Sequence, residues 1–122
     1  MFFEMDCACK GRNLDKMIQP AILMLLFKED LHGFAIVQKL ADTVMFGGSQ
    51  PDKAGVYRYL KKMEEAGLLV SEWKLEDAGD KPKKMYSITK HGRQCLANWQ
   101  VALNDYASNL QKLSKEIGET IV

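Results

Sequence analysis

The sequence predicts a mainly α-helical fold with one small β-hairpin, and three stretches carry this prediction. Residues 50–70 have the end signals and the apolar spacing of one helix, and residues 68–88 follow as two short strands around a polar tip. Residues 89–119 then keep a helical period to near the end of the chain. Helix, hairpin and helix in this order are typical of a winged helix-turn-helix, to which this sequence adds a long C-terminal helix.

The helix predicted at residues 53–66 has a signal at each end and two different faces. Asp52 is suited to the N-cap, and Gly67 is suited to the position just past the last turn. At 100° per residue, the positions expected to be buried are Val56, Tyr59, Leu60 and Met63. The opposite face consists of Ala54, Tyr57, Arg58 and Lys61. Such a face suits base edges and phosphates, although lysine-rich helix faces are also common on ordinary solvated surfaces.

The hairpin predicted after this helix carries positive charge. Residues 68–75 have the pattern of a first strand, with Leu69, Ser71, Trp73 and Leu75 on one face; residues 76–82 form the tip and residues 84–88 the second strand. From Lys81 to Arg93 there are five basic residues and no acid, whereas the formal net charge of the chain is +1. We therefore expect phosphate contacts from three wing lysines: Lys81, Lys83 and Lys84.

The last helix, predicted from Thr89 to about Glu119, is too long to lie wholly on so small a domain. At 1.5 Å per residue it would measure about 45 Å. Its apolar residues step alternately by three and four, as heptad positions do: Leu96, Trp99, Leu103, Tyr106, Leu110, Leu113 and Ile117. This period predicts helix pairing in a two-fold homodimer, which would present two recognition helices about one DNA turn apart.

A first helix is predicted before these elements, with apolar residues at helical spacing over residues 14–26 and an end near Glu29. Pro20 leaves two versions open. The helix either starts at Gln19 or Pro20, where proline is tolerated, or is one bent helix capped by Asn13, which we favour.

A second helix is predicted from about His32 to Asp42. The positions on its apolar stripe are Gly33, Ile36, Val37 and Leu40. We expect His32 to have a structural role at the helix start rather than to bind a metal, because no second ligand lies at a suitable spacing. Gly33 is expected to permit close helix packing.

The composition describes one domain. With 122 residues and 47% hydrophobic content, the chain can bury a core, and its longest apolar run, residues 21–27, is far short of the roughly 20 residues that span a membrane. The start of the chain has no signal-peptide pattern, so we expect a cytoplasmic protein without membrane contact. Cys7 and Cys9 form a Cys-x-Cys pair, with Cys95 as the third thiol of the chain, and the two thiolates of the pair are too few for a tetrahedral zinc site. Inert reduced thiols are the simplest interpretation, and a redox role or a metal shared between chains stays open.

Three blocks of the sequence resemble the signature blocks of the PadR family of bacterial transcriptional regulators: DLHGFAIVQKL, AGVYRYLKKMEEAGLL and KMYSITKHGRQCL. They occur in the family's order and spacing across roughly residues 17–96. The resemblance implies a winged-helix regulator of double-stranded operator DNA. The expected contacts on the recognition helix are Gln50, Lys53, Ala54, Tyr57 and Arg58, with Lys61 weaker.

The resemblance also implies an effector site. Some short members of the family hold flat aromatic drugs between paired tryptophans of the last helix at the dimer interface, and others respond to phenolic acids. Trp99 is the candidate here, with Tyr106 and Met17 near it. It lies earlier along the helix than the tryptophan of those drug-binding members, at whose position this sequence has Leu103.

These observations predict three parts: a flexible segment at residues 1–12, a DNA-binding winged helix-turn-helix at residues 13–89, and a dimerisation helix at residues 90–122. The leading hypothesis is a homodimeric transcriptional repressor released by a small aromatic or phenolic effector. Two alternatives stay open: a winged-helix protein-interaction module without DNA binding, and a thiol- or metal-responsive regulator that uses Cys7 and Cys9. The sequence lacks a nucleophile elbow, a phosphate-binding glycine loop and a carboxylate pair with a histidine, so we expect neither an enzyme nor a cofactor.

Overall fold

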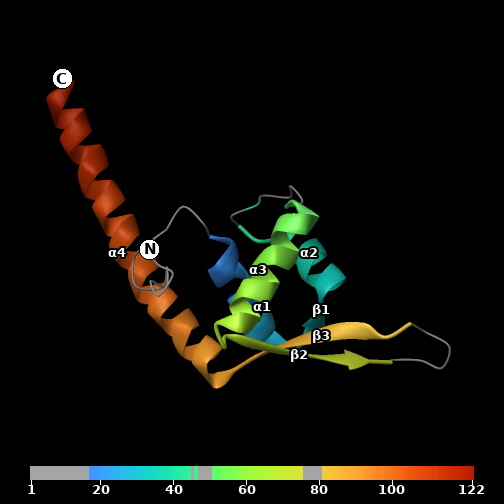
Figure 1. Cartoon of the computed structure of the whole chain (residues 1–122). Helices are drawn as coiled ribbons and strands as arrows, with labels where there is room; N and C mark the ends of the chain where they lie inside the picture. Colours follow the sequence, from blue (N-terminus) through green and yellow to red (C-terminus); the bar gives the residue numbers. More distant parts are fainter. Residues whose placement is uncertain (1–16, 45, 47–50, 76–80) are drawn as a thin grey trace.

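The computed structural model describes residues 17–44, 46, 51–75 and 81–122. The elements in chain order are α1 (Ile18–Lys28), β1 (Leu31–His32), α2 (Gly33–Ala41), α3 (Lys53–Glu65), β2 (Leu69–Lys74), β3 (Lys83–Ile88) and α4 (Lys90–Thr120). The first three helices form a small body, from which the β2–β3 hairpin extends to one side and α4 to the other (Figure 1). This arrangement is the predicted winged helix-turn-helix with a long C-terminal helix.

Helix α1 corrects the prediction of one bent helix. Met17 is its N-cap and lies before the first helical residue, so Pro20 falls in the first turn. A proline there costs no helical hydrogen bond, because the first N–H groups of a helix have no partner within it. No bend is therefore required. Asn13, the predicted cap, lies outside the described residues.

The predicted end signals of α2 and α3 are confirmed. The Nδ1 of His32 accepts a 3.3 Å hydrogen bond from the backbone N–H of Ala35, so this histidine has the expected structural role at the start of α2. The Oδ2 of Asp52 accepts a 3.0 Å bond from the N–H of Gly55 at the start of α3. Gly67 follows the C-cap of α3 with a φ of 81°, a conformation in which a side chain would be strained.

The sheet has three antiparallel strands in the order β1-β3-β2. The two long strands are those predicted, with Ser71 opposite Tyr86 and Trp73 opposite Lys84. Strand β1 was not predicted, because two residues are too few to show a strand period. Its pairing of Leu31 with Tyr86 attaches the base of the hairpin to the segment between α1 and α2.

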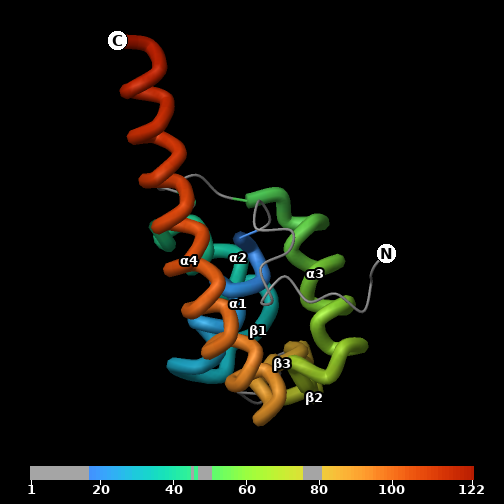
Figure 2. The backbone as a smooth tube through the Cα atoms, turned by 90° about the vertical axis from the view of Figure 1, so that its left-hand side faces the viewer, coloured from blue at the N-terminus to red at the C-terminus, as the bar shows by residue number. Residues whose placement is uncertain are grey.

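The core lies where α1, α2 and α3 meet the sheet and the first half of α4. Its fully buried side chains are those of Trp99, Ile22, Leu23, Leu26, Ile36, Leu40, Leu60, Met63, Leu69, Val37 and Val56. Trp99 is 0% exposed, and its indole Nε1 donates a 2.8 Å hydrogen bond to Oε1 of Gln19. The first half of α4 is therefore part of the body, while its second half extends beyond it (Figure 2).

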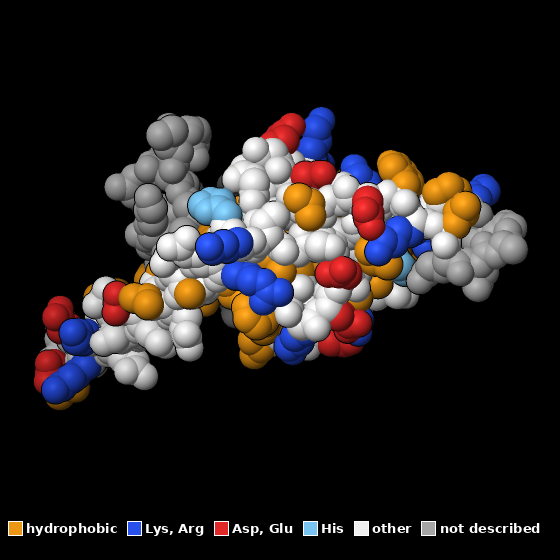
Figure 3. Space-filling view, turned by 90° about the horizontal axis from the view of Figure 1, so that it is seen from below, with side chains coloured by type: hydrophobic (Ala, Val, Ile, Leu, Met, Phe, Trp, Pro, Cys, Tyr) orange, Lys and Arg blue, Asp and Glu red, His pale blue; other side chains and the backbone are white. Residues whose placement is uncertain are grey.

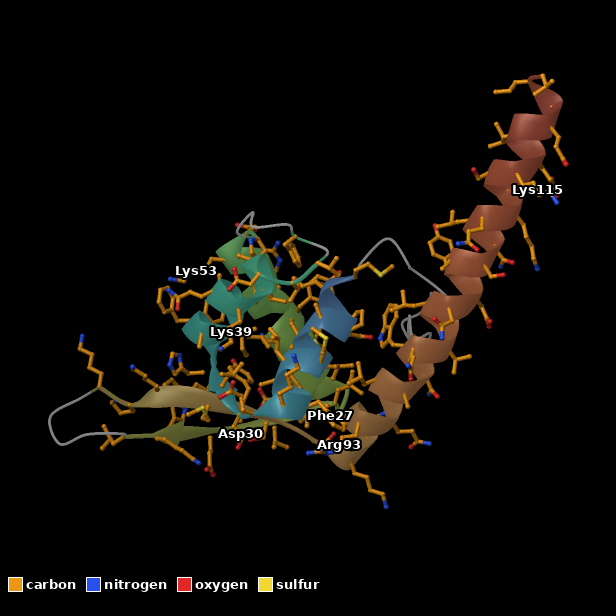
Figure 4. All side chains as sticks on the ribbon, turned by 180° about the vertical axis from the view of Figure 1, so that it is seen from behind. Phe27, Asp30, Lys39, Lys53, Arg93 and Lys115 are labelled. Carbon is orange, nitrogen blue, oxygen red and sulfur yellow. The ribbon has the colours of Figure 1, made fainter. Side chains whose placement is uncertain are left out.

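The start of α4 is fixed against both α3 and α1. The hydroxyl of Thr89 donates a 2.7 Å bond to the carbonyl of Gly67 and accepts a 2.9 Å bond from the N–H of Gly92. A Cβ at Gly92 would collide with the carbonyl oxygen of Leu68, so a larger residue would push α4 away from this turn. The guanidinium of Arg93 lies 4.5 Å from the ring centroid of Phe27 at the end of α1 (Figure 4).

Among the described residues, no helix has the length and hydropathy that crossing a lipid bilayer requires.

Candidate nucleic-acid interface

The outward face of α3 presents the side chains that the sequence pattern predicted. Val56, Leu60 and Met63 are buried, whereas the side chains of the opposite face are exposed. The exposed set consists of Lys53, Ala54, Tyr57, Arg58 and Lys61. This face runs along α3 and carries three positive charges. The major groove of DNA is wide enough to admit one α-helix, and positive side chains suit its phosphates. Gln50 lies outside the described residues.

Tyr57 is held in place by the start of α2. A Cβ at Gly33 would lie 2.5 Å from Cε1 and 3.0 Å from the hydroxyl oxygen of Tyr57, so the ring lies directly over this glycine. Tyr57 is nevertheless 38% exposed. Gly33 thus permits the close packing that was expected of it, and it positions a side chain of the exposed face of α3.

Two cations of this face, Lys53 and Arg58, each make one weak contact with a neighbouring side chain. The Nζ of Lys53 lies 5.5 Å from the ring centroid of Phe34, which is itself half exposed at the start of α2. The guanidinium of Arg58 lies 4.0 Å from Oδ2 of Asp52, with both side chains at least 70% exposed. Such exposed pairs contribute about 1 kcal/mol or less, so a phosphate or a base can replace the neighbour.

The three wing lysines do not have the same surroundings. Lys81 and Lys83 are exposed. Lys84 is half-buried, with its Nζ 4.0 Å from Oε1 of Glu64 and 6.0 Å and 5.8 Å from the ring centroids of Trp73 and Tyr86. The ammonium of Lys84 therefore lies between Glu64, at the end of α3, and the aromatic rings of Trp73 and Tyr86 on the wing.

Glu64 contacts the wing a second time. Its Oε2 accepts a 2.7 Å hydrogen bond from the hydroxyl of Ser71 on β2. The face of β2 that carries Ser71 is buried at its base, where Leu69 is 1% exposed, and open further out, where Trp73 is 68% exposed. The contact with Glu64 thus lies where the hairpin leaves the body.

Tyr86 lies buried beneath this cluster, and its phenol is hard to ionise. Burial raises its pKa above the usual 10.0, and the negative charge of Glu64 and the nearby phenol of Tyr57 raise the pKa further. The phenol therefore stays neutral throughout the physiological range.

Sequence reasoning did not identify Phe34, Glu64 or Ser71 as residues of this interface. A signal existed for Glu64, because it follows Tyr57 by seven residues and so shares its helix face. No sequence signal joins Glu64 to Ser71, since their contact depends on how the hairpin folds back along α3.

The apolar stripe of α4 divides into two parts. Leu96, Trp99 and Leu103 pack against the core of their own chain. The remaining members are 41% to 53% exposed: Tyr106, Leu110, Leu113 and Ile117. The predicted partner of this second part would be another chain, which the structure does not test.

The three residues predicted for an effector differ in exposure. Trp99 is fully buried, Met17 is half-buried against the core, and Tyr106 is 41% exposed. Cys95 is 4% exposed within the core, while Cys7 and Cys9 lie outside the described residues. Within the described ranges, no group of three His, Cys, Asp or Glu side chains is placed to hold a metal ion.

Seen from below, Lys and Arg side chains are interspersed with Asp and Glu over the body (Figure 3). This side therefore does not form a continuous basic surface, in keeping with the net charge of +1. Hydrophobic side chains recur along the projecting part of α4 in the same view.

The structure is similar to several solved structures. TA0346 from Thermoplasma acidophilum is 27% identical, with a TM-score of 0.71 over 85% of this chain and 96% of that one. A PadR family transcriptional regulator from Eggerthella lenta is also 27% identical, with a TM-score of 0.65 over 82% and 86% of the two chains. Bacillus subtilis PadR, solved in complex with operator DNA, is 27% identical with a TM-score of 0.61, over 70% of this chain and 48% of that one.

Comparison with curated protein sequences gave no match. The family model described as the transcriptional regulator PadR-like family matches residues 22–98, which is more than half of the chain and includes α2, α3, the hairpin and the start of α4. The family consists of transcriptional regulators rather than enzymes. The chain therefore belongs to the PadR-like family of transcriptional regulators.

Proposed function

We propose that this chain binds operator DNA by placing the exposed face of α3 in the major groove. The observation that carries the proposal is the outward face of α3. This face belongs to an N-capped helix, carries three exposed cations and lies beside a wing, on a fold shared with a PadR bound to operator DNA. Arg58 is 70% exposed and can bond guanine with two N–H groups, while Lys53 and Lys61 suit phosphates. Tyr57 and Ala54 lie between them and can contact base edges or thymine methyl groups.

The wing adds phosphate contacts. Lys83 is the first residue of β3 and Lys81 lies two residues before it, and both side chains are exposed. The hairpin that carries them extends away from the body (Figure 1). Lysines at such a position neutralise backbone phosphates and release counterions, which makes binding dependent on salt. Gln50, which precedes the N-cap Asp52 by two positions in the sequence and lies outside the described residues, is a further candidate contact.

We also propose that two copies pair through the second half of α4. A helix with an apolar stripe half exposed to water gains free energy when a second helix covers the stripe. The four exposed members of the stripe continue the line of Leu96, Trp99 and Leu103, so a partner helix would extend the core of each chain. The same pairing would bring two α3 helices onto one duplex.

Repression and its release by an effector complete the proposal. A small aromatic or phenolic molecule bound where the two chains meet would lie beside Tyr106, with Trp99 behind it in the core and Met17 at the start of α1. It would release the DNA only to the extent that it prefers a dimer geometry that fits the operator poorly. Such a regulator would work in the cytoplasm, beside the DNA that it controls.

One observation favours a second candidate, a winged-helix module that binds another protein. Trp73 and Leu75 share one face of the hairpin and are 68% and 63% exposed, so a partner protein could cover both. Binding through this surface would depend little on salt. A thiol- or metal-responsive regulator would depend instead on Cys7 and Cys9, which lie outside the described residues.

Selection from a pool of random duplex DNA tests the proposal, because it does not require that the operator sequence be known. We expect the protein to recover a two-fold symmetric sequence and to bind it with an affinity that falls steeply with salt, as several phosphate contacts require. Recovery of no consensus, together with salt-independent binding of a protein partner, would support the interaction module instead.

A further inference from the structure

We infer that Glu64 is a positioning residue that sets the angle between the recognition helix and the wing, and that Lys84 belongs to this arrangement rather than to the phosphate contacts. The inference rests on the proposed DNA binding. It concerns five side chains at the junction of α3 with the hairpin: Glu64, Ser71, Trp73, Lys84 and Tyr86.

Both oxygens of the Glu64 carboxylate are used, and both contacts are on the wing. Oε2 accepts the 2.7 Å hydrogen bond from Ser71 on β2, and Oε1 lies 4.0 Å from Nζ of Lys84 on β3. One side chain of α3 therefore contacts each strand of the hairpin. Because Glu64 is in the last turn of α3, these contacts relate the direction of the wing to that of the helix.

The position of Lys84 explains why it differs from Lys81. Its ammonium is surrounded by the Glu64 carboxylate and by the rings of Trp73 and Tyr86, at 6.0 Å and 5.8 Å from their centroids. The side chains of Lys84 and Glu64 are only 41% and 35% exposed, so a phosphate replaces this partner less easily than it replaces the exposed Asp52 beside Arg58. The opposite charges of Lys84 and Glu64 also cancel at a distance, so the pair attracts DNA little.

The carboxylate would be unfavourable near DNA if it had no other role. A negative side chain at the end of a recognition helix repels phosphates, and removing it should then tighten binding. Positioning predicts the opposite result, because a wing without its contacts to α3 must be ordered when DNA binds, which lowers the affinity although its lysines still meet the same phosphates. The sign of the change in affinity therefore separates the two roles.

The test compares four variants with the wild-type full chain on the duplex recovered from the random pool. Glu64→Ala removes the contacts, and Glu65→Ala is the matched control that removes the same charge from the next, exposed residue. We expect Glu64→Ala to weaken binding at least about threefold, as for removal of one member of a coupled network, and Glu65→Ala to leave binding unchanged or tighter. Lys84→Ala should weaken binding without changing the salt slope, whereas Lys81→Ala should lower the slope by about 0.9 for each phosphate that is no longer neutralised.

Hydrogen exchange of the DNA-free protein tests the wing contact on its own. Amides of β2 and β3 should exchange at least about threefold faster in Glu64→Ala than in Glu65→Ala, because the hairpin opens more often. If exchange is equal in both variants, or if Lys84→Ala lowers the salt slope as Lys81→Ala does, the inference is wrong. Should the wild type recover no duplex, DNA binding would fail as a proposal, and the exchange experiment would still decide whether Glu64 holds the wing.

Discussion

The indole Nε1 of Trp99 lies 2.8 Å from Oε1 of Gln19 and donates a hydrogen bond to it. The bond joins the long C-terminal helix to the first turn of α1, across 80 residues of sequence. It makes the first half of α4 part of the DNA-binding body. The direction in which the second half of α4 projects depends on this junction, and so would the spacing of two α3 helices in the proposed dimer.

Trp99→Phe should therefore destabilise the protein. The change removes the indole N–H and leaves space in a fully buried position, which together cost about 1–3 kcal/mol. Urea unfolding at a fixed protein concentration measures the loss. Val101→Ala is the control on the same helix, because Val101 is 62% exposed and its replacement should change the free energy of unfolding by no more than about 0.5 kcal/mol. Equal effects of the two changes would contradict the assigned role of Trp99.

Gly33→Ala should not stabilise the protein, although alanine normally stabilises a helix relative to glycine. The added Cβ would lie 2.5 Å from Cε1 of Tyr57, and moving the end of that partly exposed side chain should cost about 1 kcal/mol, which cancels the gain in helix propensity. Gly118→Ala is the matched control, because nothing lies within 4 Å of a Cβ there, and it should stabilise α4 by up to about 1 kcal/mol. Thermal unfolding of both variants compares the two changes in stability. Stabilisation by Gly33→Ala would show that Tyr57 does not rest on this glycine.

The stability of the protein should fall at alkaline pH because of Tyr86. Its pKa in the folded chain is raised above the usual 10.0, so folding favours the neutral phenol. The contribution of Tyr86 to the free energy of unfolding is constant below pH about 10, where the phenol is neutral in both the folded and the unfolded chain. It is lost as the pH rises from there through the folded-state pKa. Urea unfolding of the wild type and of Tyr86→Phe, between pH about 8 and 11, isolates this contribution. The difference in stability between the two proteins should change only above pH about 10, and a constant difference would refute the prediction.

Leu110→Glu should separate the proposed dimer. Leu110 is 48% exposed in the single chain and lies on the apolar stripe of α4, so a carboxylate there would be buried without a partner when two helices pair. Sedimentation or light scattering should show a monomer at micromolar concentration, and DNA affinity should fall with it. Ser108→Glu places the same charge on the opposite side of α4, 180° from Trp99, and should remain a dimer. A dimeric Leu110→Glu protein would place the interface elsewhere.

Much of the DNA-binding body could be predicted from local signals. Asp52 and Gly67 mark the ends of α3, and the spacing of Val56, Leu60 and Met63 identifies its buried face. These signals act within one or two helical turns, so they are visible in the sequence. Strand β1 was missed because its two residues are ordered only by pairing with β3, a contact between distant parts of the chain.

The α4 stripe shows a different limit. Its period is the same for Trp99, which packs in its own chain, and for Leu113, which is 53% exposed. A heptad pattern predicts that a helix face packs against another surface, but it does not identify that surface. The contact of Glu64 with Ser71 could not be predicted for a related reason. It joins α3 to β2, and no local signal in the sequence sets the angle between these two elements.

The central claim is that the outward face of α3 reads DNA, and Arg58→Ala tests it most directly. The side chain of Arg58 is 70% exposed and its nearest described anion is the exposed Asp52, so its removal should leave the free energy of unfolding unchanged. An anisotropy titration of the recovered duplex should show an affinity at least about tenfold lower than that of the wild type, as expected when an arginine no longer bonds a base. An Arg58→Ala protein that binds the duplex as tightly as the wild type would contradict the account.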